Sequence, residues 1–178
     1  SLKWFTPEQV GMKAIEINAS DVGAMGGKPK YALVSLVLPS EVSVEFVERL
    51  YKGMRFSGKK HGIEIIGGNM THGKEIVINI DMIGEVSKSN LKLRCNSKPG
   101  DFIFVSGYVG GSRAGLRAFL NRLNGFKEAK EEHLEPKAKY KKVKGFLKYI
   151  NAMIDVSDGL GSEINHICSQ SNVGAVIY

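Results

Sequence analysis

The stretch Asn18-Ala-Ser-Asp21-Val-Gly-Ala-Met-Gly-Gly27 places one carboxylate inside a segment of small residues. The residues before it predict a helix, because Thr6 is a good N-cap and Pro7 suits the first helical position. Apolar residues at helical spacing continue onto Asp21, so we expect the carboxylate on the face that should be apolar. Gly26-Gly27 then ends the helix.

A carboxylate on an apolar face needs a partner, and the small residues beside Asp21 let one approach closely. A metal ion or an arginine is the usual partner for an acidic side chain beside glycines. The other interpretation is that Asp21 only caps a neighbouring segment. This stretch by itself leaves both interpretations open.

The bulk composition is that of a soluble globular protein. The 178 residues are 43% hydrophobic and 24% charged, which is enough chain for one core, or for one domain and part of a second. No apolar run has membrane-spanning length, and the N-terminus is not a signal peptide. Cys95 and Cys168 have the spacing of neither a disulfide framework nor a zinc site, so we expect reduced thiols and a cytoplasmic protein.

The net charge of +7 is concentrated in a lysine-rich segment, residues 130–148. Tyr140, Phe146 and Leu147 contribute to an apolar set at helical spacing there, which predicts an amphipathic helix with lysines on its wet side. A basic surface also suits phosphorylated small molecules. The alternative from another class is a non-catalytic basic module that binds nucleic acid through this helix.

Alternating apolar and helical patterns predict an α/β or α+β fold with a mixed sheet and flanking helices, since strands and helices alternate and one strand pair is adjacent. The predicted strands are Tyr31–Leu38, Ile63–Ile66, Glu75–Val86, Phe102–Gly107, Ala152–Asp155 and Val173–Tyr178. We place a domain boundary near Pro99. Residues 1–98 then form an N-terminal domain, and residues 99–178 begin a second domain that this chain does not finish.

Three glycine motifs each follow a predicted strand and carry an oxygen-bearing side chain. They are Gly67-Gly-Asn69, Gly107-Tyr-Val-Gly-Gly-Ser112 and Asp155-Val-Ser-Asp158-Gly. Backbone N–H groups of such turns can approach phosphate oxygens. None of them is a P-loop or a Rossmann fingerprint, and each is also compatible with an ordinary tight turn.

The pair Asp155 and Asp158 is the most informative of these features. Two carboxylates so close in sequence repel each other unless a cation lies between them, and Mg²⁺ binds carboxylate oxygens together with phosphates. The alternative is that both residues cap a helix. Together with Asp21, the pair suggests magnesium and a nucleotide.

Several motifs follow one another along the whole chain. They are Ser20-Asp21-Val-Gly-Ala-Met-Gly-Gly-Lys-Pro29, Tyr31-Ala-Leu-Val-Ser-Leu36, Ile65-Ile-Gly-Gly-Asn69, Ser97-Lys-Pro-Gly-Asp101, Ser112-Arg-Ala-Gly-Leu116 and Asn151-Ala-Met-Ile-Asp-Val-Ser-Asp-Gly-Leu160. These motifs, in this order, resemble those of the thiamine-monophosphate kinases, and their joint occurrence is much more specific than any one motif. That family is related to aminoimidazole-ribonucleotide synthetases, selenophosphate synthetases and hydrogenase-maturation dehydratases.

The resemblance implies an aminoimidazole-ribonucleotide-synthetase-like fold that dimerises through its first sheet. It also implies ATP-dependent phosphorylation of thiamine monophosphate to thiamine diphosphate, by direct in-line transfer with Mg²⁺ and without a side-chain nucleophile. The expected partners are ATP, thiamine monophosphate and a second copy of the chain, and neither nucleic acid nor a membrane. The alternative within the enzyme class is another ATP-dependent synthetase of this superfamily.

The resemblance also assigns roles residue by residue. Positions that match metal ligands are Asp21, Asn69, Asp155 and Asp158. Positions that match nucleotide contacts are Tyr51, Gly68, Asn69, Arg94 and Ser157. The charge and fork geometry of Arg94 suit phosphate.

The chain departs from the family pattern in two places and covers only its middle part. Asn69 stands where many relatives carry Asp, which implies a more weakly held metal, and Gly110-Gly111-Ser112 replaces Gly-Asp-Ser. The upstream acidic segment and the downstream substrate pocket of the family have no counterpart in this sequence.

The remaining candidates favour structural roles. The four histidines share no ligand spacing, so we expect surface or capping groups at His61, His72, His133 and His166. We expect Trp4 to pack against the protein rather than to stack on a substrate.

Overall fold

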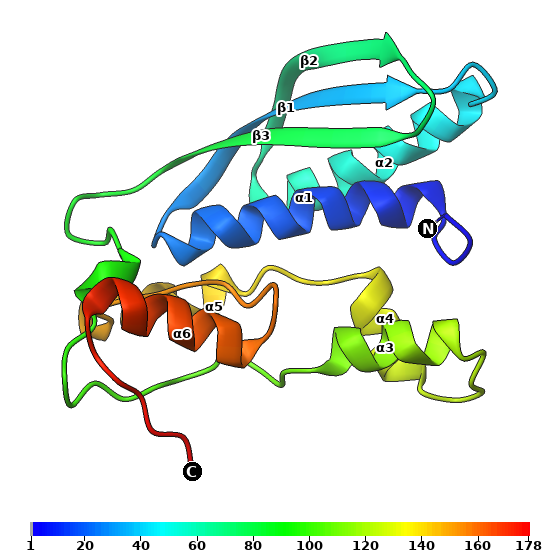
Figure 1. The fold of residues 1–178 in the computed structure, drawn as a ribbon. Helices are drawn as coiled ribbons and strands as arrows, with labels where there is room; N and C mark the ends of the chain where they lie inside the picture. Colours follow the sequence, from blue (N-terminus) through cyan, green and yellow to red (C-terminus); the bar gives the residue numbers. More distant parts are fainter. Residues whose placement is uncertain (1) are drawn as a thin grey trace.

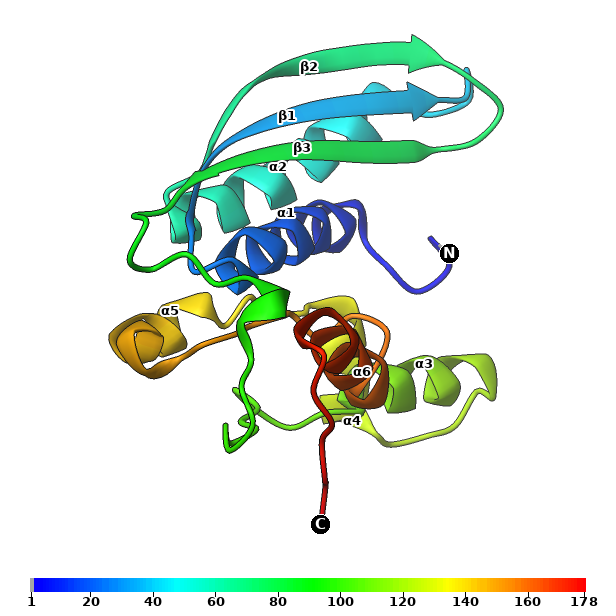
Figure 2. The same cartoon turned by 60° about the vertical axis from the view of Figure 1, so that its left-hand side comes forward.

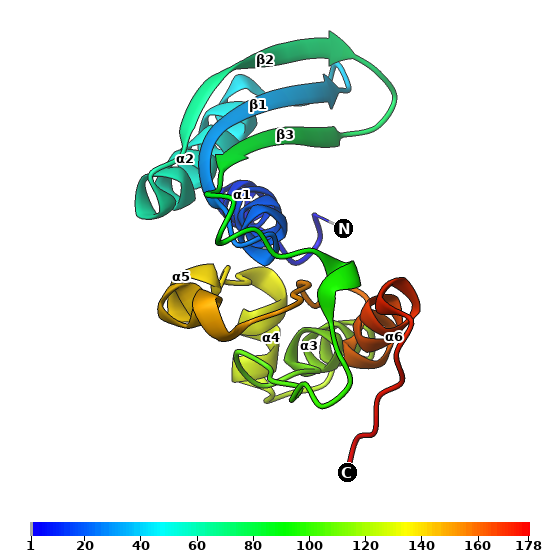
Figure 3. The same cartoon turned by 90° about the vertical axis from the view of Figure 1, so that its left-hand side faces the viewer.

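The computed structural model describes residues 2–178 and divides into a sheet, two long helices and a group of shorter helices (Figure 1). The first half contains α1 (Pro7–Ala24), β1 (Lys28–Leu38), α2 (Val44–His61), β2 (Glu64–His72) and β3 (Val77–Glu85). The second half contains η1 (Arg94–Asn96), α3 (Gly111–Leu120), α4 (Lys127–Leu134), α5 (Tyr140–Val143), η2 (Lys144–Tyr149) and α6 (Leu160–Ser171). Figure 3 shows α1 between the sheet and the elements of the second half.

The sheet is mixed, as the alternation of strands and helices predicts. Its strand order is β2-β1-β3, with β1 parallel to β2 and antiparallel to β3. Helix α2 makes the crossover that a parallel pair requires. In Figure 2, α1 and α2 lie on the same face of the sheet, and its other face is open.

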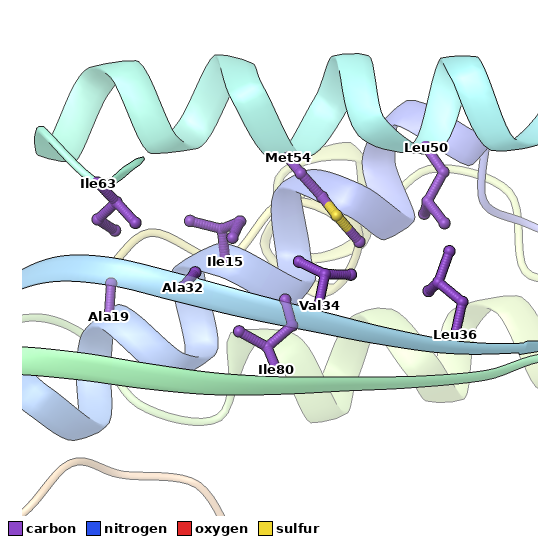
Figure 4. Packing of buried hydrophobic residues seen from close by; sticks show 9 residues of the cluster. All are labelled: Ile15, Ala19, Ala32, Val34, Leu36, Leu50, Met54, Ile63 and Ile80. Carbon is purple, nitrogen blue, oxygen red and sulfur yellow. The ribbon is translucent and has the colours of Figure 1, made fainter. Parts of the chain in front are cut away.

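The core lies between the sheet and these two helices (Figure 4). Alternate residues of β1, Ala32, Val34 and Leu36, are buried against Ile15 of α1 and Met54 of α2. In β3 the predicted alternation is confirmed. Its core-facing residues are Ile78, Ile80 and Met82, and its open-face residues are Val77, Asn79, Asp81 and Ile83.

Helix α1 begins as predicted, and Val10 and Ala14 of the predicted stripe pack against the core, but the stripe does not continue to Ile17 and Asp21. Thr6 Oγ1 accepts a hydrogen bond from Gln9 N at 3.2 Å, and the Gln9 side chain accepts one from Thr6 N at 3.0 Å. The buried positions are Gly11, Ile15, Glu16, Ala19 and Gly23. Ile17 is 48% exposed and Asp21 is exposed, so the expectation that Asp21 follows an apolar stripe is wrong.

Strand β2 continues through the first glycine motif instead of ending at Ile66. Gly68 pairs with Val34 of β1, and a Cβ built on Gly68 would overlap the Val34 carbonyl oxygen. Its φ of 149° also favours glycine. Gly67-Gly-Asn69 is therefore not a turn after a strand, and the close approach of β1 explains Gly68.

The three later strands expected from sequence are wrong, because residues 102–107, 152–155 and 173–178 pair with no strand within the described chain. The side chains of Phe102 and Phe104 are 86% and 88% exposed. An apolar run favours extended backbone, but a strand also needs a neighbouring edge for its hydrogen bonds, and residues 2–178 place no such edge beside these segments.

The lysine-rich segment does not form the expected continuous amphipathic helix. Instead, a short α4 ends at Leu134 inside the segment, and after a break the four-residue α5 passes directly into the 3₁₀ helix η2. Gly145 lies at the start of η2, and glycine is a poor helix former. Leu147 is buried while Phe146 is exposed, so the apolar set does not share one face.

His61 is buried rather than on the surface, and it belongs to a polar cluster around Glu16. The Glu16 carboxylate, 4% exposed, accepts hydrogen bonds from Lys60 Nζ at 2.7 Å, Ser57 Oγ at 3.1 Å and Ala138 N at 2.7 Å. His61 Nε2 lies 3.0 Å from Glu16 Oε2. Burial opposes ionisation of Glu16, but these partners lower its pKa to about 2.

The N-terminal segment packs on α3 and α4 through aromatic rings. Trp4 stacks on Phe119 with ring centroids 5.3 Å apart, in agreement with the packing role expected for it. Phe5 meets His133 edge-on, and Lys13 Nζ donates to the His133 carbonyl at 2.7 Å. Burial and the nearby Lys13 charge lower the pKa of His133, which is half-buried rather than exposed.

Replacing Glu16 with glutamine (Glu16→Gln) should lower the free energy of unfolding by about 3 kcal/mol at neutral pH, because Lys60 and His61 lose a buried counter-charge. The measurement is urea unfolding. Glu48→Gln, at an exposed position of the neighbouring helix, should change stability by less than about 0.5 kcal/mol.

The same pair of variants gives a pH test. Because the pKa of folded Glu16 is lowered from 4.5 to about 2, its contribution is complete above pH 4.5 and is lost as the pH falls toward 2. The stability difference between the unsubstituted protein and Glu16→Gln should therefore narrow over that interval. A difference independent of pH would contradict this assignment.

Candidate functional site

The structure brings two of the predicted acidic residues together from distant parts of the chain. Asp21 lies in the last turns of α1, and Asp155 lies in the extended segment that leads to α6. Burial raises the pKa of Asp155, and the neighbouring Asp21 carboxylate raises it further. Two carboxylates held so close together form a site of unbalanced negative charge, which is the electrostatic condition for binding a cation.

The loop after Asp155 is held by Glu163, which is not among the site residues predicted from the sequence. Its carboxylate, 4% exposed, accepts hydrogen bonds from Asp158 N at 3.0 Å, Ser157 Oγ at 3.3 Å and Ser157 N at 3.4 Å. Glu163 lies in the first turn of α6, where the helix dipole favours an acidic side chain. An acidic residue just inside a helix and a few positions after Ser-Asp-Gly was the available signal.

This arrangement leaves the Asp158 side chain exposed and its carboxylate without a hydrogen bond inside residues 2–178. Throughout residues 2–178, no three His, Cys, Asp or Glu side chains are grouped so that they could hold a metal ion. The chemistry still fits Mg²⁺, which is usually bound by one or two carboxylates and completes its six ligands with water and phosphate oxygens. The Asp21–Asp155 pair has the ligand type and number of such a half-site.

Asn69 lies elsewhere. Its register partner in β1 is Ser35, and Ser35 pairs with Asn79 of β3, so the three residues form a polar row on the open face of the sheet. Helix α1 covers the opposite face, where Val34 is buried. The four predicted metal ligands therefore do not form one cluster within the described chain.

The other predicted nucleotide contacts are also dispersed. Tyr51 is half-buried on α2 and packs against the core. Arg94 is exposed in η1, which packs on α6, and its carbonyl accepts a hydrogen bond from Ser171 Oγ at 2.7 Å at the far end of that helix. Its guanidinium forms no hydrogen bond or ion pair within residues 2–178 and remains available for an anion.

The motif Gly107–Ser112 favours the tight-turn interpretation. Gly110 has a φ of 92°, and α3 begins at the next residue. Glu132 of α4 approaches Gly111 so closely that a Cβ built there would overlap its carboxylate. An acidic side chain thus already lies at the positive end of α3, where a phosphate would otherwise be favoured.

Comparison with known proteins finds relatives of the kind that the motifs resemble. Residues 1–86 match the model of the AIR synthase related protein, N-terminal domain. The chain is 40% identical to the thiamine-monophosphate kinase of Aquifex aeolicus over 176 residues, and 36% identical to that of Bacillus subtilis over 185 residues. These alignments cover 97% and 99% of this chain. The chain is homologous to the thiamine-monophosphate kinases.

Solved structures show that the fold is also that of this family. The thiamine-monophosphate kinase of Aquifex aeolicus superposes with a TM-score of 0.88 over 94% of the chain, at 40% identity. A second solved structure, AaThiL complexed with AMPPCP and TMP, gives a TM-score of 0.89. The structure from Stenotrophomonas maltophilia K279a, at 28% identity, gives 0.88 over 95% of the chain.

The chain spans 57% of the length of the Aquifex aeolicus and Bacillus subtilis thiamine-monophosphate kinases. The similarity thus extends over nearly the whole of this chain but over only a part of those proteins. Across residues 2–178, no helix combines the length and the apolarity needed to cross a membrane.

Asp155→Asn should raise the melting temperature of the metal-free protein at neutral pH by about 2–4 °C, corresponding to about 1 kcal/mol, because it removes the repulsion between two adjacent carboxylates. Differential scanning calorimetry in the presence of EDTA measures this effect. Added Mg²⁺ should then stabilise the unsubstituted protein more than the variant.

The matched control is Glu41→Gln, which also removes one negative charge but lies in an exposed loop. It should leave both the melting temperature and the response to Mg²⁺ nearly unchanged. Destabilisation of the metal-free protein by Asp155→Asn would show that Asp155 has a structural partner instead of a repulsive neighbour.

Proposed function

We propose that the protein to which this chain belongs is an ATP-dependent thiamine-monophosphate kinase of thiamine biosynthesis, which transfers a phosphoryl group to thiamine monophosphate and forms thiamine diphosphate. The observation that carries the proposal is the meeting of Asp21 and Asp155, since each lies in a motif that resembles this family. Homology to thiamine-monophosphate kinases over nearly the whole chain supports the choice of reaction.

In this proposal Asp21 and Asp155 would hold Mg²⁺, which would supply positive charge to neutralise phosphate oxygens. Glu163 keeps the loop of Ser157 and Asp158 in place through three hydrogen bonds, so the free Asp158 carboxylate is presented on an ordered turn. The Arg94 guanidinium is available for phosphate oxygens. No side chain is required as a nucleophile, because positioning and charge stabilisation carry most of the catalysis in phosphoryl transfer.

We further propose that a second copy of the chain covers the open face of the sheet. That face carries a row of partly exposed apolar side chains, Tyr31, Leu33, Val77 and Ile83. Apolar residues aligned on one face of a sheet favour burial against another surface. Asn69 lies on the same face, so the nucleotide contacts assigned to Gly68 and Asn69 belong to a part of the site at this interface.

The proposed domain boundary stays near Pro99, with residues 1–98 as the N-terminal domain and residues 99–178 as the start of a second. The family match over residues 1–86 supports the first of these units. We also propose a cytoplasmic location, in keeping with a biosynthetic kinase and with two free cysteines.

The kinase proposal is tested by ADP release from the full-length protein with thiamine monophosphate, compared with other phosphorylated acceptors. Asp21→Asn should lower kcat by about 100-fold or more, since it removes a charge that binds the metal in the transition state. It should also abolish the Mg²⁺-dependent thermal stabilisation by an ATP analogue.

Glu41→Gln is again the control and should retain both activity and stabilisation. Indifference of the unsubstituted protein to nucleotide and Mg²⁺ would refute the proposal. Release of ADP with another acceptor but not with thiamine monophosphate would favour the related synthetases instead.

The dimer is tested by light scattering after size-exclusion chromatography. Leu33→Lys places a charge in the middle of the open face and should convert a dimer into a monomer, because the charge would be buried without a partner. Val44→Lys, at a well-exposed position outside the sheet, should leave the dimer intact. A monomeric unsubstituted protein would contradict the assignment.

A further inference from the structure

Residues 138–141, from the second half of the chain, contact both α1 and α2. Ala138 N donates to Glu16 Oε2 at 2.7 Å, and Lys141 Nζ donates to the Lys60 carbonyl at 2.6 Å. The Tyr140 hydroxyl lies 3.2 Å from His61 Nδ1, with the two ring centroids 5.5 Å apart. This four-residue segment, called the strap below, is thus attached at a backbone donor, a ring and a lysine.

The strap also reaches the end of α1 that carries Asp21. Gly23 is buried, and a Cβ built on it would overlap the Cβ and the ring of Tyr140. The tyrosine ring therefore rests directly on the helix backbone, two residues beyond Asp21. Any side chain at position 23 would push Tyr140 and the last turn of α1 apart.

The chain runs from the strap to Asp155 over a short path with few other attachments. Residues 144–149 form η2, where Leu147 is buried, and Asn151 Nδ2 donates to both Asp101 carboxylate oxygens, at 2.9 and 3.1 Å. No strand pairing holds residues 150–159 within the described chain. Within residues 138–159, the side-chain hydrogen bonds to α1 and α2 therefore all come from the strap.

We propose that Tyr140 and Glu16 are positioning residues: through the strap, they set the separation of Asp21 and Asp155 that a shared cation requires. This inference rests on the proposed function, in which those two carboxylates hold Mg²⁺. Tyr140 acts on the backbone at Gly23, and Glu16 fixes the strap through Ala138 N. Supporting groups of this kind orient metal ligands without touching the metal.

The test measures the Mg²⁺ concentration at half-saturation for binding of an ATP analogue to the full-length protein, well below its unfolding midpoint. Gly23→Ala and Tyr140→Ala should raise this concentration by about tenfold or more, the usual loss when a supporting group is disturbed. Tyr140→Phe keeps the ring on Gly23 and should stay within about twofold of the unsubstituted protein.

Ile80→Val is the matched control, since it weakens the core on β3 away from the strap. This control should have a lower unfolding midpoint and an unchanged Mg²⁺ concentration at half-saturation. If Tyr140 and Gly23 had a purely structural role, their variants would behave in the same way. If Tyr140→Ala does not fold, Tyr140→Leu, which keeps an apolar side chain over Gly23, replaces it. Because Tyr140→Leu lacks the ring, its Mg²⁺ concentration at half-saturation should still exceed that of Tyr140→Phe.

The outcomes separate the two proposals. One outcome is that nucleotide binding requires Mg²⁺ and Asp21, but the Mg²⁺ concentration at half-saturation is the same in Gly23→Ala and the Tyr140 variants as in Ile80→Val. This outcome would overturn the positioning role and leave the kinase proposal standing. Absence of Mg²⁺-dependent binding in the unsubstituted protein would refute the kinase proposal and the positioning role with it. The positioning role is supported if the Mg²⁺ concentration at half-saturation is raised in Gly23→Ala and nearly unchanged in Tyr140→Phe.

Discussion

Helix α1 is buried on two sides, and the rest of the structure depends on this constraint. One side, with Ile15 and Ala19, closes the hydrophobic core beneath the sheet. Another side, with Glu16 and Gly23, receives the strap from the second half of the chain. A helix packed in this way has little freedom to rotate, since turning it would expose apolar area or leave the Glu16 charge buried without partners. Its exposed edge, including Asp21, is oriented as a consequence.

The site on that edge is electrostatically unfavourable by itself. Asp21 and Asp155 repel each other, and the raised pKa of Asp155 reflects both its burial and that repulsion. Residues that serve a ligand often oppose stability in its absence, because the folded state must hold them where the ligand needs them. Glu163 shows the opposite pattern, since one oxygen of its buried carboxylate, Oε1, accepts all three hydrogen bonds that hold the loop of Ser157 and Asp158.

Local signals predicted local structure well and contacts poorly. The cap at Thr6 and the alternation in β3 were correct, since each depends on neighbouring residues. Gly68 was misread as part of a turn because its requirement comes from the backbone of Val34, more than thirty positions earlier in the chain. His61 was misread as a surface group for the same reason: its partners Glu16 and Tyr140 lie on other elements.

By itself, the sequence determined the fold class, the mixed sheet and the similarity to the thiamine-monophosphate kinases, because periodicity and ordered motifs can be recognised without knowledge of distances. It also named the acidic residues from which a metal site can be built. Only the tertiary structure decided that Asp21 and Asp155 adjoin while Asn69 faces away, and that a strap from residues 138–141 braces α1. Those facts depend on how α1 packs between two layers, and packing is a property of side chains that meet across the fold.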